Sequence, residues 1–310
     1  MAKNKKVLIT GSTGLLGLSL IRNRPRAFDL YGGYYKFPAE RLPYKQACGY
    51  HEFDIRKKEE VDSMFDKISP DILVHAASLG SVDYCENNKE QARQTNIDGS
   101  RNLIEACKRG GAFFIFISSN AVFDGENPPY GESDTPNPID YYGRTKLRTE
   151  TDLVESGIQH AVLRLMTMYG WNHPLERQNP VTWILEKLIK DNRVNIVDDI
   201  FNNHLFVDNA SQAVWAAASK NKQGIYHVAG GETISRYELA CRTADIFGLD
   251  KGLIRPVSSS FFPSIAPRPK NTSYRIEKTQ KELLVAGMDV RTGLTLMRDD
   301  PPKEWKYDWC

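Results

Sequence analysis

Lys5-Lys-Val-Leu-Ile-Thr10 runs directly into Gly11-Ser-Thr-Gly-Leu-Leu-Gly17, and this stretch decides the fold. The first six residues form an apolar run of β type, and we expect a helix over residues 15–22. A strand, a glycine-rich turn and a helix in this order are the context in which spaced glycines indicate a dinucleotide site. Gly11 would allow the tight turn, Gly14 the close approach of a pyrophosphate, and Gly17 the packing of the helix on the strand.

The N-terminus of that helix would offer unpaired N–H groups and a partial positive charge to phosphates. We therefore expect the whole loop to bind the cofactor, through Gly11, Ser12, Thr13, Gly14, Leu15, Leu16 and Gly17. The alternative is a strand-to-helix turn that binds no ligand.

Strands and helices alternate through the first half of the chain. Apolar runs typical of buried parallel strands occur at 7–10, 29–35, 72–76, 113–118 and 161–165. Amphipathic segments lie between them, at 15–22, 59–68, 89–109 and 142–156. This alternation predicts an α/β fold with a doubly wound parallel sheet and helices on both faces.

After Leu165 the pattern loosens. We expect helices at 180–191, 209–220 and 235–247, a strand at 224–228, and an ordered but irregular cap beyond Gly252. The predicted organisation is a dinucleotide-binding domain over 1–165, to which 204–228 returns. A smaller, mixed substrate-binding part would comprise 166–203 and 229–310.

Composition narrows the class of protein. The chain has 310 residues, 41% of them hydrophobic, and a net charge of +2, which gives no sign of nucleic-acid or membrane binding. No run of residues is apolar and long enough to span a membrane. Five scattered cysteines without a Cys-x-x-Cys predict neither a disulfide framework nor a zinc ribbon, so we expect a cytoplasmic protein.

Ligands of such sheets bind at the carboxyl ends of the strands. Where an NAD site would place an acid after the second strand, this chain has Tyr35 and Lys36. A cation there suits a ribose 2′-phosphate, so NADP(H) is favoured and NAD(H) remains possible. Asp54 could accept a hydrogen bond from the adenine amino group, or it could cap a helix. Other strand-end positions complete the expected cofactor site: Ile55, Ala76, Ala77, Ser78 and Ser118.

Tyr142 and Lys146 are one helical turn apart and would face the same side of a helix. A cation close to a phenol favours the phenolate, so we expect the pKa of Tyr142 to fall from about 10 toward neutrality. Such a tyrosine could transfer a proton at working pH. Ser119, at the end of a buried strand, could donate to the same substrate oxygen, although a serine there is more often a turn residue.

These residues carry a family resemblance. The chain resembles the extended short-chain dehydrogenase/reductases, whose core is a Rossmann fold. The shared motifs, in the family's order, are Gly11-x-x-Gly14-x-x-Gly17, His75-Ala-Ala77, Asn96-x-Asp-Gly99, Ser119 and Tyr142-x-x-x-Lys146. Further blocks are similar to the dTDP-4-dehydrorhamnose reductase branch: Val82-Asp-Tyr-Cys-Glu86, Val122-Phe-Asp-Gly125, Pro129-Tyr-Gly-Glu-Ser-Asp134, Met168-Tyr-Gly-Trp171 and Arg268-Pro269. The regulatory beta subunit of methionine adenosyltransferase belongs to the same branch and has many similar blocks.

The resemblance implies an NADPH-dependent reductase of a 4-keto-6-deoxy nucleotide sugar. Tyr142 would protonate the forming alkoxide, and Ser119 would hydrogen-bond the same oxygen. Lys146 would lower the tyrosine pKa and hold the nicotinamide ribose, and Asn96 would position a proton-relay water. The alternatives are a nucleotide-sugar epimerase and a non-catalytic NADP-binding regulatory subunit, and a homodimer is possible.

Departures from the family pattern narrow the reaction. Dehydratases carry an acidic pair just after the catalytic Ser or Thr, where this chain has Asn120 and Ala121. The reductase branch itself usually has Asp-Tyr at these two positions, so the resemblance does not determine which sugar is the substrate. Members that bind magnesium need a Glu where Leu15 stands, so we expect no metal. Candidates for the substrate pocket are Val82, Asn120, Trp171, Arg177, Asn179, His204 and Arg268.

Overall fold

The computed structural model describes residues 4–262, 266–304 and 306–307. Its centre is a seven-stranded sheet in the order β11-β6-β5-β4-β1-β2-β3, in which every pair of neighbours is parallel. The strands are β1 (Lys5–Thr10), β2 (Phe28–Tyr34), β3 (Gly49–Glu52), β4 (Ile72–His75), β5 (Phe113–Ser119), β6 (His160–Leu165) and β11 (Gly224–Val228).

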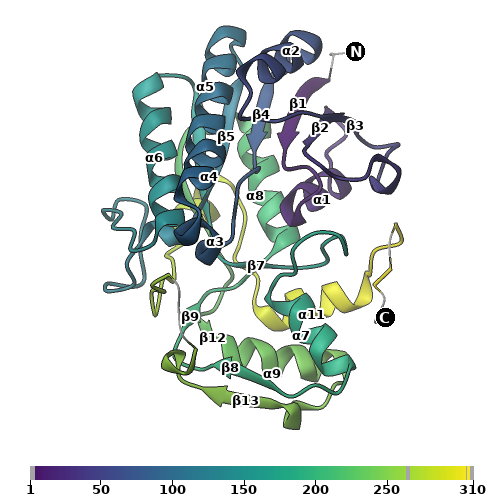
Figure 1. The fold of residues 1–310 in the computed structure, drawn as a ribbon, viewed down its shortest axis with the longest axis vertical. Coiled ribbons are helices and arrows are strands. Elements are labelled where there is room, and N and C mark those ends of the chain that lie inside the picture. Colours follow the sequence, from purple (N-terminus) through teal and green to yellow (C-terminus); the bar gives the residue numbers. More distant parts are fainter. Residues whose placement is uncertain (1–3, 263–265, 305, 308–310) are drawn as a thin grey trace.

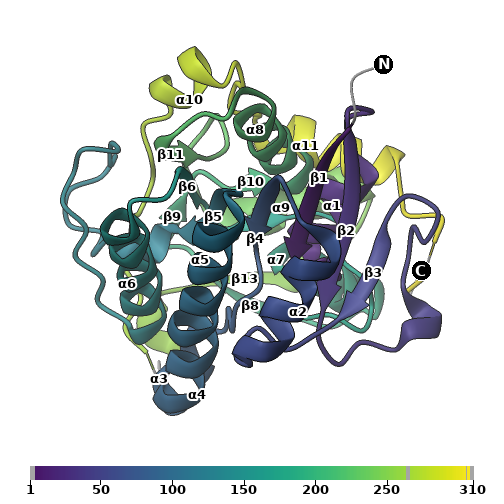
Figure 2. The same ribbon diagram turned by 90° about the horizontal axis from the view of Figure 1, so that it is seen from above.

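Helices cover both faces of this sheet, as Figure 2 shows from above. One face carries α2 (Lys58–Ile68), α5 (Gly99–Gly110) and α6 (Tyr141–Ser156), and the other carries α1 (Leu15–Arg22) and α8 (Val207–Lys220). Successive residues of a strand point to opposite faces. Leu8 therefore packs in the core under α2 and α5, whereas Val7 and Ile9 pack in the core under α1 and α8.

The chain reverses its direction of travel across the sheet between β1 and β4, and the crevice at such a switch point is where open α/β sheets bind ligands. Two short helices follow β4, α3 (Val82–Asn87) and α4 (Lys89–Arg93). A π-helical turn at Gln94–Asp98 joins α4 to α5, so the single helix expected over 89–109 is interrupted.

Whereas α10 (Glu277–Glu282) packs beside β11, most of the remaining elements gather below the main sheet in Figure 1. Three two-stranded sheets form there, from β7 (Met168–Tyr169) with β10 (Leu205–Phe206), β9 (Phe201–Asn202) with β12 (Ile234–Ser235), and β8 (Val194–Val197) with β13 (Ile254–Val257). The helices are α7 (Pro180–Ile189), α9 (Arg236–Phe247), α10 (Glu277–Glu282) and α11 (Val290–Asp299). Short 3-10 turns occupy Ala39–Arg41, Asn120–Val122, Lys251–Leu253 and Ser259–Phe261.

The predicted fold class, a doubly wound parallel sheet with a smaller mixed part, is confirmed. The expectation of an irregular cap beyond Gly252 is wrong in part, because β13, α10 and α11 lie there. The side chain of Asp289 caps α11 by accepting from the Thr292 N–H. We propose the predicted division of the chain into 1–165 with 204–228, and 166–203 with 229–310, since β11 and α8 pack in the main sheet layer.

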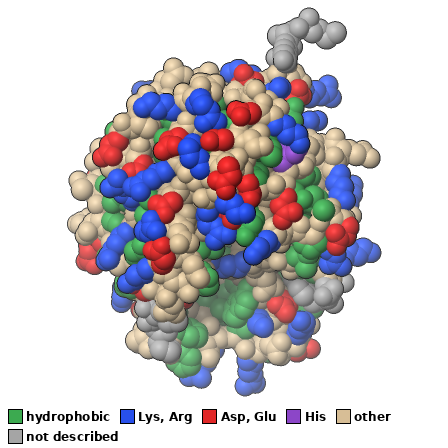
Figure 3. All heavy atoms as spheres, turned by 45° about the horizontal axis from the view of Figure 1, so that its top comes forward, with side chains coloured by type: hydrophobic (Ala, Val, Ile, Leu, Met, Phe, Trp, Pro, Cys, Tyr) green, Lys and Arg blue, Asp and Glu red, His purple; other side chains and the backbone are tan. Residues whose placement is uncertain are grey.

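The surface in Figure 3 carries Lys and Arg side chains interspersed with Asp and Glu, without a patch of one sign on that face. Among the described residues, no helix is both long and apolar enough to cross a membrane. Near the C-terminus, Tyr307 is buried and its hydroxyl donates to the Asn172 carbonyl. Trp305 and Trp309 lie outside the described residues.

Candidate active site

The switch point opens into two adjoining cavities that share the glycine loop. The first, about 430 Å³, extends from this loop toward the ends of β2 and β3, and we call it the β2 cavity. The second, about 520 Å³, extends toward the end of β5, the start of α6 and the C-terminal part, and we call it the β5 cavity. Both are lined by Gly11, Gly14, Ala76 and Ser78.

The glycine loop has the shape of a phosphate cradle. Gly11 has a φ of +70°, and a Cβ there would lie 2.8 Å from the backbone nitrogen of Ala77. A Cβ on Gly17 would lie 2.4 Å from the carbonyl oxygen of Gly11, so α1 packs too closely for any side chain. Gly14 is the N-cap of α1 and supplies no side-chain cap. The N–H groups at the start of α1 are therefore available to an anionic ligand, and the residues present fit a dinucleotide diphosphate.

Of the other loop residues, some line a cavity and one is buried in the protein interior. Ser12 is fully buried and its hydroxyl donates to the Gly33 carbonyl at 3.0 Å, so its side chain binds β2 of the sheet. The Thr13 hydroxyl donates to the Glu176 carboxylate at 2.7 Å. Leu15 and Leu16 line the β5 cavity.

Tyr142, Lys146 and Ser119 meet at the wall of the β5 cavity. Asp140 caps α6 and fixes its start, which carries Tyr142, and Lys146 follows one turn later. Ser119 is the last residue of β5. The side chains of Ser119 and Ser78 are near enough to the Tyr142 phenol to lower its pKa, and the Ser119 hydroxyl donates to Asn120 Oδ1 at 3.3 Å. The structure thus brings the three predicted catalytic side chains together and adds a second serine.

Burial has the largest effect on the pKa values of Tyr142 and Lys146. It raises the pKa of Tyr142 to about 12, against the lowering effect of the hydrogen bond from Ser119. Lys146 donates to the Ile117 carbonyl at 2.9 Å, and its Nζ lies 5.7 Å from the centre of the Tyr142 ring. Burial lowers the pKa of Lys146 to about 8. The predicted fall of the tyrosine pKa is therefore wrong, and the phenol is protonated at neutral pH.

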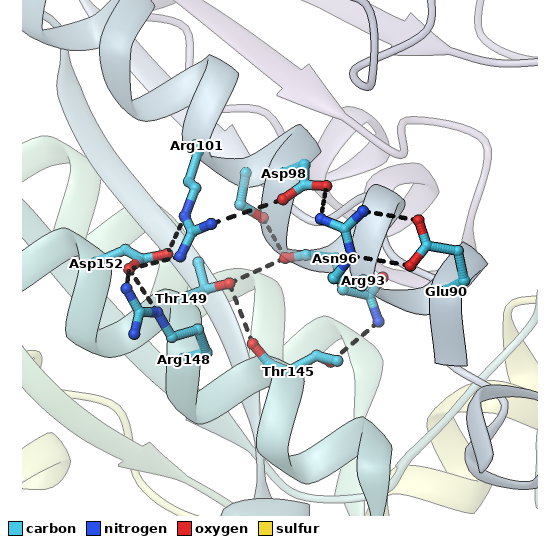
Figure 4. Close-up of polar contacts among 10 residues, drawn as sticks. Glu90, Arg93, Asn96, Asp98, Arg101, Thr145, Arg148, Thr149 and Asp152 are labelled. Carbon is cyan, nitrogen blue, oxygen red and sulfur yellow. Dashed lines mark hydrogen bonds and ion pairs between the residues drawn. The ribbon is translucent and has the colours of Figure 1, made fainter. Parts of the chain in front are cut away.

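Asn96 lies in the π-helical turn and ties it to α6 (Figure 4). Its side-chain oxygen accepts from the Leu79 N–H at 2.8 Å, and its Nδ2 donates to the Leu79 carbonyl and to the Thr145 hydroxyl, both at 3.2 Å. Its backbone carbonyl accepts from the hydroxyls of Ser100 and Thr149, at 2.7 and 2.9 Å. Asn96 thus holds the helix that carries Tyr142 and Lys146, and the relay water stays a prediction.

A buried chain of hydrogen bonds connects this turn to the cofactor crevice. His75 Nδ1 lies 2.8 Å from the Thr10 hydroxyl and His75 Nε2 lies 2.8 Å from the Ser100 hydroxyl. Since Ser100 uses its proton on the Asn96 carbonyl, it must accept from His75, so Nε2 carries the hydrogen. Burial lowers the pKa of His75 to about 3, which keeps the ring neutral.

The far end of the β2 cavity is lined by Tyr35, Asp54, Ile55 and Arg56, with Ala77 on the opposite wall. The buried Asp54 carboxylate accepts from Arg56 Nε at 2.9 Å and from Nη2 at 2.6 Å. The hydrogen bond from Arg56 lowers the pKa of Asp54.

The interpretation of Asp54 as a helix cap is wrong, because α2 begins at Lys58 with Lys57 as its N-cap. Lys36 is exposed beside this cavity, with Nζ 5.1 Å from the centre of the Tyr35 ring.

The outer wall of the β5 cavity carries polar and cationic side chains. Val82, Asn120, Arg177 and Arg268 all line it. Asn120 donates to the Thr272 hydroxyl at 2.7 Å.

The two predicted arginines of this wall have protein partners. Arg177 donates to the Gly80 carbonyl at 3.0 Å, and Arg268 pairs with Asp83 at 2.8 Å. Both guanidinium groups still face the cavity, as predicted for substrate-binding residues.

Arg236, at the start of α9, lies on the same wall, and the sequence reasoning missed it. Its Nε is buried without a hydrogen-bond partner among the described residues. Burial and the neighbouring Arg268 lower the pKa of Arg236. Two arginines that line one cavity, one of them with an unsatisfied Nε, form an environment that an anion would stabilise.

The structure corrects two predicted substrate residues. Trp171 points away from both cavities, donates from Nε1 to the Met297 carbonyl at 2.6 Å, and packs against Phe247 and Tyr307. His204 is buried, lines neither cavity and has no hydrogen-bond partner on either ring nitrogen among the described residues.

Asn179 and Ser118 touch the β5 cavity, but their side chains have structural partners. Asn179 caps α7 in a capping box. The Ser118 hydroxyl donates to Glu150, which forms a buried ion pair with Arg164 at 2.7 Å.

Among the charged residues that line the cavities, Arg56, Glu176 and Arg236 escaped prediction and bear on ligand binding. Arg56 follows Asp54 by two positions, and a charged pair after a strand could have indicated it. Arg236 follows Ser235 in the turn that leads into α9, but nothing in the sequence distinguishes it from a surface arginine. Glu176 lies in an irregular segment without a motif. Within the described part of the chain, no group of three or more His, Cys, Asp or Glu side chains is arranged to hold a metal ion.

Comparison with known proteins identifies the family of this chain and solved structures with the same fold. The model of the RmlD substrate binding domain matches residues 5–300. The methionine adenosyltransferase 2 subunit beta of Bos taurus is 34% identical over 286 residues, which span 86% of this chain and 79% of that protein. A probable low-salt glycan biosynthesis reductase of Haloferax volcanii is 26% identical over 278 residues, 89% of this chain and 91% of that protein.

Among solved structures, the dTDP-4-dehydrorhamnose reductase of Bacillus anthracis in complex with NADP has the same fold. The TM-score is 0.82 at 23% identity, over 96% of this chain and 99% of that one.

Proposed function

Because this chain belongs to the RmlD substrate binding domain family, we propose that it is an NADPH-dependent reductase of a nucleotide-linked 4-keto-6-deoxy sugar. The observation that carries the proposal is the meeting of Ser119, Tyr142 and Lys146 at the wall of a cavity that continues from the glycine loop. A protein that only binds a nucleotide has no need of a buried phenol beside a lysine and two serines.

The cofactor would supply the hydride that adds to the keto carbon of the sugar. Its diphosphate would lie on the glycine loop, against the start of α1. Tyr142 supplies the proton: its O–H bond breaks as the proton passes to the oxygen that was the carbonyl. Ser119 donates a hydrogen bond to the same oxygen, which becomes negatively charged as the hydride arrives.

Lys146 stabilises the phenolate that Tyr142 becomes. Its ammonium group is held by the Ile117 carbonyl and lies beside the phenol ring. Because its pKa of about 8 is above neutrality, the group is mostly charged at pH 7. A buried cation next to a newly formed anion is favourable in a medium of low polarity.

The guanidinium groups of Arg236 and Arg268 support a substrate that carries a diphosphate. Both arginines line the β5 cavity, so a second phosphate-bearing ligand could meet them there. Asn120 and Ala121 provide no acid or base beside Ser119, which supports reduction over dehydration.

The test is NADPH oxidation with a panel of 4-keto-6-deoxy sugars linked to different nucleoside diphosphates. We expect turnover with at least one of them. Tyr142→Phe should lower kcat by about 10²–10⁴ while leaving NADPH affinity unchanged. Tyr141→Phe is the matched control, since Tyr141 lies on the same helix but beside Lys89 and outside the cavity.

A second candidate is a non-catalytic NADP-binding subunit, favoured by the identity to the methionine adenosyltransferase subunit. Tight NADPH binding without turnover on any substrate of the panel would support it and reject the reductase. An epimerase, the third possibility, would convert the substrate without net NADPH consumption.

A further inference from the structure

The Asp140 carboxylate lies on the wall of the β5 cavity, and only one of its two oxygens has a partner in the described part of the chain. Oδ1 accepts from the Gly143 N–H at 2.7 Å and so caps α6. No described residue donates to Oδ2. Asp140 is nevertheless buried, with 2% of its surface exposed. A buried carboxylate oxygen without a protein partner, on a residue that lines a cavity, is an acceptor that a ligand can use.

The other carboxylate of this cavity already has a cationic partner. Of the described residues that line the β5 cavity, two are acidic, Asp83 and Asp140. Asp83 pairs with Arg268 at 2.8 Å, whereas Asp140 forms no ion pair with any described residue. Burial raises the pKa of Asp140, while the Gly143 N–H and the charge of Arg268 lower it. The Arg268 guanidinium therefore lies near Asp140 but is held by Asp83.

Capping a helix does not require a second carboxylate oxygen, since Ser and Asn cap about as well as Asp. Where Asp caps α11, both oxygens are used within the first turn. One oxygen of Asp289 accepts from the Thr292 N–H at 2.9 Å, and the other accepts from the Thr292 hydroxyl at 2.6 Å. Asp140 has no such second donor, so its cap leaves Oδ2 for another purpose.

Asp140 lies near both ends of the proposed substrate site. It precedes Tyr142 by two residues, at the start of α6. This start packs directly on the turn after β5, because a Cβ on Gly143 would lie 2.0 Å from the Ala121 carbonyl oxygen. Arg268, whose charge acts on Asp140, lines the same cavity. A nucleotide sugar that reaches from Tyr142 to Arg268 therefore has its ring beside Asp140.

The two edges of such a ring differ in what they offer to a carboxylate. The keto carbon is C-4 and the diphosphate is attached at C-1, so one edge carries C-2 and C-3 and the other carries C-5 and the ring oxygen. In a 6-deoxy sugar the second edge presents a methyl group and an ether oxygen, which donate no hydrogen bond. Hydroxyl or ammonium groups on C-2 and C-3 do donate, and an ionised carboxylate only accepts.

We propose that Asp140 is a specificity-determining residue that accepts a hydrogen bond from a hydroxyl or ammonium group on C-2 or C-3 of the sugar. It thereby fixes which edge of the ring faces α6. The inference rests on the nucleotide-sugar binding of the proposed function. It narrows the substrate class to sugars that carry such a donor.

The test measures binding by calorimetry to the purified full-length protein. Binding is preferred to turnover because burial and, to a smaller extent, the charge of Asp140 raise the pKa of Tyr142. For each nucleoside diphosphate in the panel, the probes are the nucleoside diphosphate alone, its 6-deoxyhexose derivative with hydroxyls on C-2, C-3 and C-4, and the 2-deoxy, 3-deoxy and 3-amino forms of that derivative. The wild type should bind one of the deoxy forms about tenfold or more weakly than the parent sugar, the effect of losing a hydrogen bond to a charged group.

Asp140→Ser keeps a cap for α6 but removes the second oxygen. It should weaken binding of the parent sugar by about tenfold or more and remove the difference between the parent and the deoxy form. It should not weaken binding of the nucleoside diphosphate alone or of NADPH. Asp140→Asn distinguishes the two donor groups. A neutral amide still hydrogen-bonds a hydroxyl, so the loss should be smaller than in Asp140→Ser for the parent sugar but equally large for the 3-amino form.

Asp289→Ser is the matched control. Asp289 caps α11 as Asp140 caps α6, and it lines neither cavity. This variant should leave every Kd unchanged. Thermal unfolding of each variant checks that it folds.

Equal binding of the parent and both deoxy forms by the wild type would overturn the inference, and so would an Asp140→Ser variant that keeps the wild-type preference. Turnover with the panel would then leave the reductase proposal standing, with Asp140 as a helix cap only. A selective loss of sugar binding in Asp140→Ser, in a protein without turnover, would support the inference and reject the reductase. A wild type that binds no nucleotide sugar would reject both.

Discussion

Replacing Lys146 by Met should make the protein more stable at neutral pH while removing its proposed activity. Lys146 is 97% buried, since only 3% of its surface is exposed, and its Nζ donates to the Ile117 carbonyl. Burial lowers its pKa from 10.5 to about 8. Holding the charge inside the protein at pH 7 therefore costs about 3 kcal/mol, at about 1.4 kcal/mol for each tenfold change in the dissociation constant.

Methionine fills a similar volume without a charge. The Ile117 carbonyl loses a donor, which costs about 1–2 kcal/mol. The variant should therefore be about 1–2 kcal/mol more stable than the wild type at pH 7, where Lys146 is charged in both the folded and the unfolded protein.

The sign of the pH dependence follows from the same pKa values. Between pH 8 and 10.5 the unfolded wild type binds more protons at Lys146 than the folded protein does. Its free energy of unfolding gains a contribution that rises with pH through this window. The variant lacks this contribution, so its advantage should shrink or reverse by about pH 10.

Urea denaturation of both proteins at pH 7 and near pH 10 gives the four free energies of unfolding that are needed. Other groups titrate equally in the two proteins and cancel in the difference. A variant that is less stable at pH 7, or a difference that does not change with pH, would refute the reasoning. Either result would mean that Lys146 is not held charged at a cost to the fold.

Three further changes test other parts of the site. Glu176→Gln removes a carboxylate bonded to Thr13 in the phosphate cradle, and relieving about 1.4 kcal/mol of repulsion between like charges should make NADPH bind about tenfold more tightly by calorimetry. Glu150→Gln breaks the buried pair with Arg164 and should lower the free energy of unfolding in urea by about 3–5 kcal/mol. Gly17→Ala places a methyl group 2.4 Å from a loop carbonyl oxygen, so it should weaken dinucleotide binding and lower Tm, and a variant that binds normally would contradict the close packing.

The parts of the fold that sequence predicts are those fixed by local pattern. The run Lys5–Thr10, its glycines and the helix after them needed only neighbours in sequence, and the structure has the same strand and the same helix bounds. The inner strands β4, β5 and β6 are almost continuous buried runs, which sequence identifies well, whereas the edge strand β3 has no buried residue. The meeting of Ser119 with Tyr142 required the further knowledge that strand ends share one edge of the sheet.

The site residues that the sequence predicted wrongly or did not predict depend on contacts between segments that are distant in the chain. Trp171 was expected at the substrate, but its indole donates to the carbonyl of Met297, on a helix that the sequence did not predict. Arg236 gains its importance only because the cavity wall brings it beside Arg268. Residue type alone cannot distinguish such an arginine from one on a solvated surface.

The predicted pKa of Tyr142 is the most instructive error. Both residues of the pattern, Tyr142 and Lys146, were identified, and the predicted direction of the pKa shift was still wrong. The pattern predicted that a lysine one turn away would favour the phenolate, but the largest influence on the pKa of Tyr142 is burial, which raises it. The result bears on the direction of the reaction. A phenol that stays protonated at pH 7 is ready to give a proton to an oxygen that gains negative charge, as reduction requires. Oxidation of an alcohol must begin from the phenolate, which burial disfavours at this site. The same burial that contradicts the sequence prediction therefore keeps Tyr142 in the protonated form from which the proposed reduction begins.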